Sequence, residues 1–573
     1  MSRFICLVFI LSIGASMAHT QGTPNPADQL QREQERLEQL RKTQKSTDRS
    51  DEIKVSEDQK RELIPVEELC FPIDRVGFEP LSNERSSLHD FSWALEAVDF
   101  TASGEHDPAL GRCLGIVGLQ LIVRRTQNAI IEAGFTTTRV FLGPQNLATK
   151  ELKLTLIPGY LREIRFSDAH ANIHEGNALP RREDGLLYLR DIEQGLENLK
   201  RVPTVEADFQ IVPSRVADAV AGESDIEINW QQSKPYRFSL SIDDSGSEAT
   251  GVYKGSFTFS VDNPAGLSDL FYVNFDKDLG GGLDGDRGTE AIALHYSLPL
   301  GYWQLSIDAS KSAYHQTIVG ATQNYVYSGE SESANVKLSR IVHRDSVGKT
   351  SVSFSGWARA SRNFIDDTEV EVQRRRTAGW ELGLNHTRSI NRATLDAGLT
   401  LRKGTGAFGA LAAPEEAFGE GVSRPTILKV NLGYQSPVRF LGSEWNYSGR
   451  LTGQWSDTPL IAQDRFSIGS RHSIRGFSGE SSLLGERGWT IRNDLSRRIG
   501  GTNHSAYVGL DLGAVYGPST ASLAGNELVG ATLGLKGKLR GVNYNAYVAQ
   551  AVHRPENFDK GGSVFDFSLN WNF

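Results

Sequence analysis

The sequence predicts two small α+β modules followed by a transmembrane antiparallel β-barrel. First, the 573 residues are only 39% hydrophobic, with a mean hydropathy of -0.35, and contain no apolar run long enough for a membrane-spanning helix. Second, helical and strand patterns alternate between residues 66 and 233. Third, the chain after residue 233 alternates apolar with polar residues, without a second helical layer, which favours a closed membrane barrel.

The first 18 residues have the features of a secretory signal peptide. They carry one positive charge, Arg3, then an apolar stretch over residues 4–14 and small residues before Ala18. This order of charge, apolar segment and small residues predicts cleavage after Ala18. The mature chain is therefore expected to fold outside the cytoplasm.

Cysteine is rare, and only three cysteines occur in the chain. Removal of the signal peptide takes away Cys6 and leaves Cys70 and Cys113. In an oxidising compartment these two can form a disulfide. Two buried thiols are the alternative.

Residues 19–45 contain a polar helix-forming stretch, and residues 46–65 form a linker. Among the 18 positions from Asp28 to Lys45, only Leu30, Leu37 and Leu40 are apolar. Such a helix is about 27 Å long, close to the thickness of a hydrocarbon core, and is stable where polar walls surround it. A solvated spacer helix or a short coiled coil is the alternative. The linker is charged and rich in Ser and Asp up to Pro65.

The two α+β modules are predicted over residues 66–157 and 158–233. In the first, apolar spacing indicates a helix over 116–133, and alternation indicates a strand over 151–156. In the second, a strand near Ile164 is followed by a helix over 191–200 and by strands around Phe209 and Ile226.

Residues 234–573 predict the barrel. Tyr236, Phe238 and Ile242 share one parity of the first strand, and serine and charged residues occupy the other. The last strand alternates in the same way and ends on Trp571 and Phe573. The length suits 16 strands of about 21 residues each including connections, and 14 or 18 strands also fit. A soluble β-sandwich would alternate as well, but so many strands without a helical layer favour a barrel.

Several motifs together resemble the outer-membrane transporters of two-partner secretion, the TpsB family, which includes haemolysin, filamentous-haemagglutinin and contact-dependent-inhibition exporters. The resemblance covers essentially the whole mature chain. It implies that the two modules are periplasmic POTRA domains, that residues 19–45 are a plug helix and that the barrel has 16 strands. The motifs are Cys70-Phe71-Pro72-Ile73 with Cys113, Pro158-Gly159-Tyr160, residues 189–196, 243–246, 262–269, 487–489 and 492–495, and Ile474-Arg475-Gly476-Phe477.

The resemblance also implies a contact inside the barrel. The segment Ile474, Arg475, Gly476 and Phe477 resembles the tip of a long loop that folds into the lumen, and Asp511 and Gly513 resemble its partner strand, although Leu510 replaces the usual aromatic residue. In that strand Val508, Leu510 and Leu512 are apolar and would face lipid, so Asp511 must face inward. A guanidinium can satisfy an inward carboxylate with two hydrogen bonds. We therefore expect Arg475 to meet Asp511.

By resemblance, the function is export of a large partner exoprotein whose amino-terminal secretion domain binds the POTRA domains. The passenger would be a haemolysin, an adhesin or a contact-dependent inhibition toxin. The implied location is the bacterial outer membrane, with lipid around the barrel and POTRA domains in the periplasm. Trp571 and Phe573 would be a terminal signal for the barrel assembly machinery, and the oligomeric state expected is a monomer. The alternative is a factor that inserts other barrels into the outer membrane.

Composition and motifs exclude other classes. A net charge of -9 and a pI near 5.8 argue against nucleic acid as a partner. The sequence contains no His-Glu-x-x-His, Gly-x-Ser-x-Gly, Walker A or Cys-x-x-Cys motif and no metal-ligand spacing. We therefore expect no enzyme activity, no metal and no cofactor.

Overall fold

The computed structural model describes residues 36, 62–80, 90–101, 103–167, 175–180, 182, 184–556, 558 and 562–573. The predicted signal peptide (1–18) lies outside the described residues. So do the predicted plug helix (19–45), except Arg36, and the predicted linker up to residue 61. In the described part of the chain, no helix is long and apolar enough to cross a membrane.

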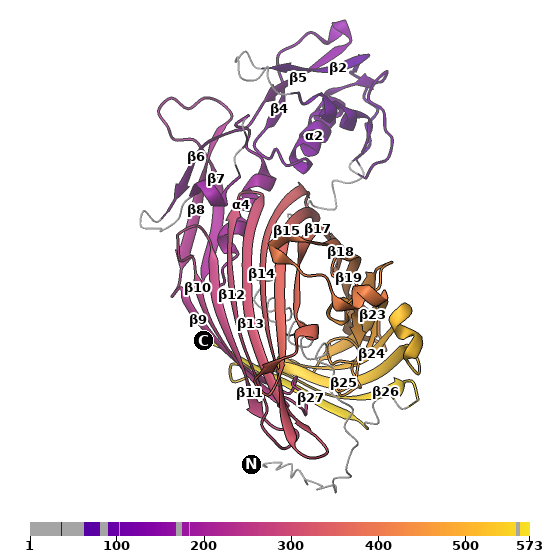
Figure 1. The fold of residues 1–573 in the computed structure, drawn as a ribbon. Helices are drawn as coiled ribbons and strands as arrows, with labels where there is room; N and C mark the ends of the chain where they lie inside the picture. Colours follow the sequence, from indigo (N-terminus) through magenta and orange to yellow (C-terminus); the bar gives the residue numbers. More distant parts are fainter. Residues whose placement is uncertain are drawn as a thin grey trace, which may run out of the picture.

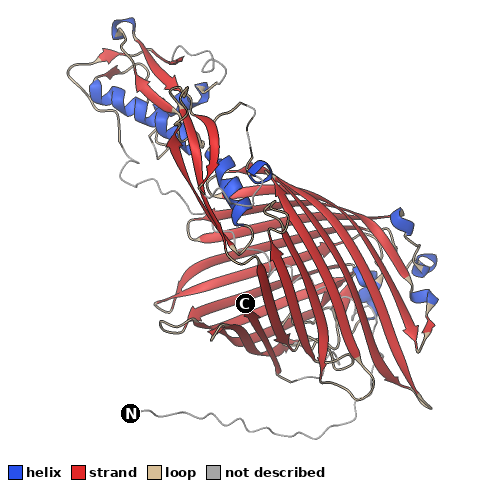
Figure 2. Ribbon diagram, turned by 90° about the vertical axis from the view of Figure 1, so that its left-hand side faces the viewer, coloured by secondary structure: helices blue, strands red, loops and turns tan. Residues whose placement is uncertain are grey.

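Two small α+β units extend from one end of a large barrel (Figures 1 and 2). In the first unit, β5 is the middle strand of a three-stranded sheet, with β2 parallel and β4 antiparallel to it. The amphipathic helix α2 buries Leu119, Ile122 and Ile130 in the core of this unit. The elements are β1 (Phe71–Pro72), β2 (Arg75–Pro80), η3 (Ser92–Asp99), β3 (Cys113–Leu114), α2 (Ile116–Glu132), β4 (Arg139–Leu142), η4 (Leu147–Thr149) and β5 (Glu151–Ile157).

The second unit repeats this plan with a sheet of order β6-β8-β7. Helix α4 packs against the sheet through Ile192 and Leu199, which join a core with Ile226 and Ile228. The elements are β6 (Tyr160–Phe166), α3 (Glu175–Ala178), α4 (Leu189–Lys200), β7 (Val205–Pro213) and β8 (Glu223–Gln232). Helix α4 begins two residues earlier than the sequence pattern predicts.

Sixteen long strands of the described chain close into an antiparallel barrel, which completes when β27 pairs with β9. The two-residue β16 pairs only with β15. The strands are β9 (Tyr236–Asp243), β10 (Tyr253–Asp262), β11 (Leu270–Gly280), β12 (Gly288–Leu300), β13 (Trp303–Val319), β14 (Asn324–Arg344), β15 (Gly348–Ile365), β16 (Thr368–Glu369), β17 (Arg375–Ile390), β18 (Ala393–Thr405), β19 (Thr426–Phe440), β20 (Ser443–Trp455), β23 (Arg487–Arg498), β24 (His504–Tyr516), β25 (Glu527–Leu539), β26 (Val542–His553) and β27 (Val564–Asn572).

Short helical turns and one small hairpin lie in the loops that connect these strands. The hairpin joins β21 to β22 within the long connection from β20 to β23. These elements are η5 (Glu371–Gln373), η6 (Ala407–Gly409), η7 (Pro414–Phe418), η8 (Ala462–Asp464), β21 (Phe466–Ile468), β22 (Leu483–Gly485) and η9 (Pro518–Ser522).

The alternation of side chains separates a lipid face from a lumen face. In β9 the apolar residues, including Phe238 and Leu240, are exposed on the outside of the barrel. The last strand follows the same rule, with Trp571 outside, and the Phe573 N–H donates to the Phe238 carbonyl over 2.9 Å. The terminal residues therefore help to close the barrel. Their role as an assembly signal stays a prediction.

Ion pairs fasten the second unit to the periplasmic rim of the barrel. The carboxylate of Glu197 in α4 accepts from Arg344 Nη1 at 2.6 Å and from Lys349 Nζ at 2.9 Å, at the facing ends of β14 and β15. Burial by itself would raise the pKa of the Glu197 carboxyl, but Lys349 and Arg344 outweigh it and hold the pKa below its ordinary value. The Tyr302 hydroxyl also donates to Asp191 over 2.6 Å. These contacts join helix α4 of the second unit to the rim of the barrel.

Candidate functional site in the barrel lumen

The long loop between β20 and β23, residues 456–486, folds into the lumen. Its residues Ile474 and Phe477, in the connection between β21 and β22, are 0% and 2% exposed. Phe477 packs edge to face on Phe558, with ring centroids 5.8 Å apart. A small apolar cluster holds the loop tip, formed by Ile468, Ile474, Phe477, Leu483, Val515 and Leu528.

Arg475 lies at the loop tip and meets Asp511 on the inner face of β24. The guanidinium donates twice, from Nε to Oδ2 over 2.6 Å and from Nη2 to Oδ1 over 2.7 Å. The backbone N–H of Arg475 donates to Oδ2 over 3.1 Å. Asp511 is fully buried and Arg475 is 2% exposed. Such a two-point, charge-assisted contact fixes both the position and the orientation of the loop tip.

Two residues of β23 complete this contact; both belong to a motif noted in the sequence, which gave neither of them a role. Asp494 lies 2.7 Å from Arg475 Nη2 and supplies a second carboxylate. Arg492 donates to the backbone carbonyl of His472 over 2.9 Å and to that of Arg471 over 3.2 Å. The loop is thus held through its backbone as well as through Arg475.

Glycines in the loop tip and in the barrel wall allow the two backbones to approach closely. Gly476 has φ of +104° and would place a Cβ 2.6 Å from the backbone of Gln550. A Cβ on Gly530, opposite Asp511 in the sheet, would lie 1.7 Å from the Arg475 carbonyl oxygen. A Cβ on Gly513 would lie 3.0 Å from Ile474. These positions accept no side chain unless the loop moves.

Gly530→Ala is therefore expected to displace the loop tip while the barrel still assembles. Overpacking of this kind costs about 1–3 kcal/mol, which shifts the fraction of seated loop by roughly tenfold or more. Limited trypsin digestion of the detergent-solubilised protein should then cleave after Arg475, which is protected in the wild type. Gly356→Ala is the matched control, because its added Cβ meets no atom within 4 Å. Equal protection in both variants would show that the wall can accommodate the methyl group.

A second arginine of the loop, Arg471, contacts residues at the junction where β27 meets β9. Its Nη1 lies 2.6 Å from Asp244 Oδ1, just after β9, and 3.3 Å from Asp566 Oδ1 in β27. The loop therefore contacts both sides of the junction where the barrel closes.

Arg36 is a helical residue that is buried against the inner wall of β9 to β11. It donates to Ser256 Oγ over 2.7 Å and to Ser245 Oγ over 3.0 Å. Its Nη2 also lies 3.1 Å from Asp276 and 3.4 Å from Asp243. The arginine is 7% exposed, so a charged group of the segment predicted as a plug helix is seated in the lumen.

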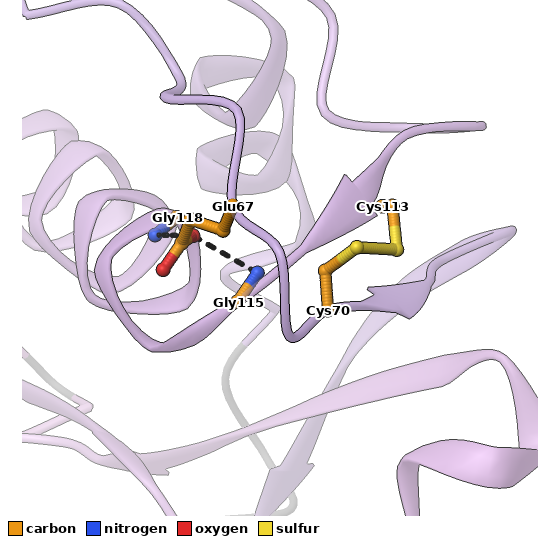
Figure 3. Close-up of a disulfide and its surroundings, with 5 residues drawn as sticks. All are labelled: Glu67, Cys70, Cys113, Gly115 and Gly118. Atoms are coloured by element: carbon orange, nitrogen blue, oxygen red, sulfur yellow. Dashed lines mark hydrogen bonds between the residues drawn. A yellow bond between two sulfur atoms is a disulfide. The ribbon is translucent and has the colours of Figure 1, made fainter.

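Outside the membrane, the structure joins Cys70 to Cys113 by a disulfide in the first unit (Figure 3). Beside it, the Glu67 carboxylate accepts from the N–H groups of Gly115, Val117 and Gly118 over 2.8–3.0 Å, at the start of α2. Burial by itself would raise the pKa of the Glu67 carboxyl, but these three donors outweigh it and hold the pKa below its ordinary value. The segment before β1 is thus anchored on the start of α2.

The depressed pKa of Glu67 gives this anchor a pH dependence. A depressed folded-state pKa means that the anchor is fully present above the unfolded value, about 4.3 for Glu, and is lost as the pH falls through the lower folded value. At neutral pH, Glu67→Gln should speed hydrogen exchange of the Val117 and Gly118 amides. The neighbouring exposed Glu68→Gln should leave both rates unchanged. Equal protection in wild type and Glu67→Gln would remove the anchoring role.

One rule could have found most of the residues that sequence analysis missed. Asp276 and Asp494, like Asp511, are carboxylates at the inward parity of a strand, and each requires a cationic partner. Arg36 gave no such signal, because nothing in a polar helix marks which cation meets the wall. No group of side chains in the described residues could hold a metal ion.

Comparison with known proteins gives consistent matches along the chain. The family profile of the haemolysin secretion/activation proteins ShlB/FhaC/HecB matches residues 222–537. A ShlB-type POTRA profile matches residues 99–159, and a second POTRA profile matches 160–213.

Individual relatives agree with these profiles. The outer membrane transporter CdiB-2 of Burkholderia pseudomallei is 32% identical over 97% of both chains. The hemolysin transporter protein ShlB of Serratia marcescens is 26% identical over 70% of this chain and 71% of its own. The solved structure of CdiB from Acinetobacter baumannii is 28% identical, with a TM-score of 0.81, and the match covers 97% of this chain and all of that one.

POTRA domains followed by a 16-strand antiparallel barrel define a protein transporter of the bacterial outer membrane, and this confirms the predicted fold class and location. The chain belongs to the ShlB/FhaC/HecB haemolysin secretion/activation family and is a two-partner secretion transporter, not an enzyme. Family membership decides against the alternative of a factor that inserts other barrels.

Proposed function

We propose that the passenger is a large exoprotein of the contact-dependent inhibition or haemolysin type, and that it leaves through the barrel lumen after the segment carrying Arg36 withdraws. The observation that carries this proposal is the seating of Arg36 among Asp243, Ser245, Ser256 and Asp276. The segment that carries Arg36, held in this place, closes the resting lumen. A path opens only when this segment withdraws. The proposal also assigns residues 66–157 to the first POTRA domain, 158–233 to the second POTRA domain and 234–573 to the barrel.

Capture of the passenger would take place on the second POTRA unit. Strand β7 is an edge strand of its sheet and pairs only with β8 among the described strands. An extended segment of the passenger's secretion domain can add to such an edge, with backbone pairs that demand little sequence. Because Glu197 fastens this unit to the rim, a strand bound at β7 starts beside the barrel mouth. The absence of nucleotide in the periplasm leaves folding of the passenger outside the cell to give export its direction.

Secretion of the exoprotein encoded beside this protein tests the proposal. Cells that carry the wild-type transporter should release the exoprotein or display it on the surface, and cells without the transporter should retain it in the periplasm. If the exoprotein stays periplasmic in both, while other barrels misassemble without this protein, the passenger assignment fails.

A strand-breaking substitution separates capture from transport. Ile211→Pro in β7 should abolish binding of the secretion domain without changing barrel insertion, because proline cannot donate to an added strand. Ala217→Pro, at an exposed position of the turn after β7, is the control in the same unit. Unchanged binding by Ile211→Pro would move the capture surface elsewhere.

A further inference from the structure

The lumen loop has a second attachment that lies far around the barrel from Arg475. Asp464, at the end of η8, lies 3.0 Å from Arg359 Nη2 in β15, and Arg402 of β18 lies 4.0 Å away. Asp464 and Arg359 are 8% and 9% exposed. Arg402 in turn stacks on Trp357, with its guanidinium carbon 3.7 Å from the ring centroid. The neighbouring Gln463 donates to Ser361 Oγ in β15 over 3.0 Å.

The topology makes the loop a strap across the lumen. Around the barrel, β15 and β27 are nine steps apart one way and seven the other, which places them on opposite sides. Asp464 attaches to β15, and Arg471 attaches to Asp566 of β27. Asp464 and Arg471 are seven residues apart in sequence, a span of at most about 24 Å when extended, so the two attachments are joined by a short stretch of chain.

The two attachments differ in how many of their buried polar atoms are satisfied. At the tip, Arg475 has a two-point contact, a backbone bond and an apolar cluster around Ile474 and Phe477. One buried atom there, Asp494 Oδ1, has no hydrogen-bond partner among the described residues, although it lies 2.7 Å from Arg475 Nη2. At the base, Gln454 Nε2 donates to the Asp464 backbone carbonyl over 2.8 Å, but three buried atoms have no hydrogen-bond partner among the described residues: Asp464 Oδ2, Arg402 Nε and Gln463 Oε1. A partly satisfied buried network is less stable than a complete one. The base is therefore the weaker attachment.

We propose that Asp464, with Arg359 and Arg402, is a second anchor of the loop, and that this anchor is the one that releases when the lumen opens. Release at Asp464 frees the strap to swing toward β23 and β24, while Arg475 keeps its bond to Asp511. Asp464 acts through the loop and is a positioning residue. This inference rests on the proposed route through the lumen.

A reversible lock tests the release. Gln463 Nε2 and Ser361 Oγ lie 3.0 Å apart, and the native cysteines are already bonded to each other. Because a cysteine is shorter than glutamine, the Ser361→Cys, Gln463→Cys pair is joined by a short bis-maleimide that contains a cleavable disulfide. Cross-linking should lower secretion of the exoprotein by about tenfold, the change that corresponds to about 1.4 kcal/mol, and a reductant should restore it. Each single-cysteine variant, treated alike, is the control. Normal secretion by the cross-linked double variant would overturn the proposal, whereas absence of secretion by the wild type would overturn the proposed function instead.

Pore conductance provides a readout that a purely structural role would not move. In planar bilayers, Asp464→Asn should raise the fraction of time that the pore is open by about tenfold. The substitution removes the negative charge that attracts Arg359 and Arg402, and so weakens the attachment at the base of the loop. Asp464→Glu keeps the charge and should return toward wild-type behaviour. Asp457→Asn, an exposed carboxylate near the start of the same loop, is the matched control. Heat-modifiable migration on gels confirms that each barrel is folded. Wild-type gating by Asp464→Asn would contradict the anchor.

Discussion

Arg475→Ala is expected to leave the transporter inserted in the outer membrane and to lower secretion of its exoprotein by about two orders of magnitude. The substitution removes the two-point partner of Asp511, which is fully buried, and leaves it only Arg492, whose Nε lies 3.8 Å from Oδ2. Breaking a buried pair in this way costs about 3–5 kcal/mol. The wall strands pair through their backbones and remain in place, so the loop moves rather than the barrel. Quantitative immunoblotting of the culture medium measures the effect.

Two further variants separate charge from shape at this contact. Asp511→Asn removes the charge with almost no change in volume and should reproduce most of the loss. Arg475→Lys keeps the charge but loses the two-point geometry, and should fall between wild type and Arg475→Ala. Arg439→Ala, at the exposed periplasmic end of β19, is the control for removal of an arginine. Normal secretion by Arg475→Ala would refute the role of the contact.

Arg36→Ala is expected to increase the ion conductance of the purified transporter in planar bilayers. The arginine satisfies the carboxylates of Asp243 and Asp276 on the lumen wall, and removal leaves both without this partner. Two weakened ion pairs of about 1–2 kcal/mol each would raise the open fraction by one to two orders of magnitude. Deletion of residues 19–45 should increase conductance further, to a permanently open level.

Arg36→Lys is the matched control for this second prediction, since it keeps the positive charge at the same position. It should leave the conductance nearer the wild-type value than Arg36→Ala does. If Arg36→Ala and the deletion both conduct like wild type, residues 19–45 serve as a spacer and the lumen is closed by the loop alone.

The barrel was predictable because membrane strands follow a strict two-residue period. Phe238 and Leu240 outside and Asp511 inside all follow from parity, since a one-residue shift would expose the polar set to lipid. Helix α2 was predictable for a similar reason, because Leu119, Ile122 and Ile130 lie on one face.

Contacts between distant segments were predictable only where a motif marked both partners. Arg475 and Asp511 are 36 residues apart, and their pairing came from resemblance combined with parity. Asp464 and Arg359 are 105 residues apart, and no pattern links them. The room that Gly530 leaves for the loop is likewise a property of the assembled wall. A single sequence records which strands face inward, but not which residues meet across a wide lumen.

Passage of the exoprotein through the lumen is the central claim, and site-specific photo-crosslinking of a stalled passenger tests it most directly. A passenger fused to a stably folded domain stops within the transporter. The Ser333 side chain pairs with Ser310 on the inner wall. A photoreactive residue at position 333 should therefore cross-link to the stalled passenger. The same residue at Ala334, the next position and exposed on the outer face, should not. Cross-links from Ala334 but not from Ser333 would contradict export through the lumen.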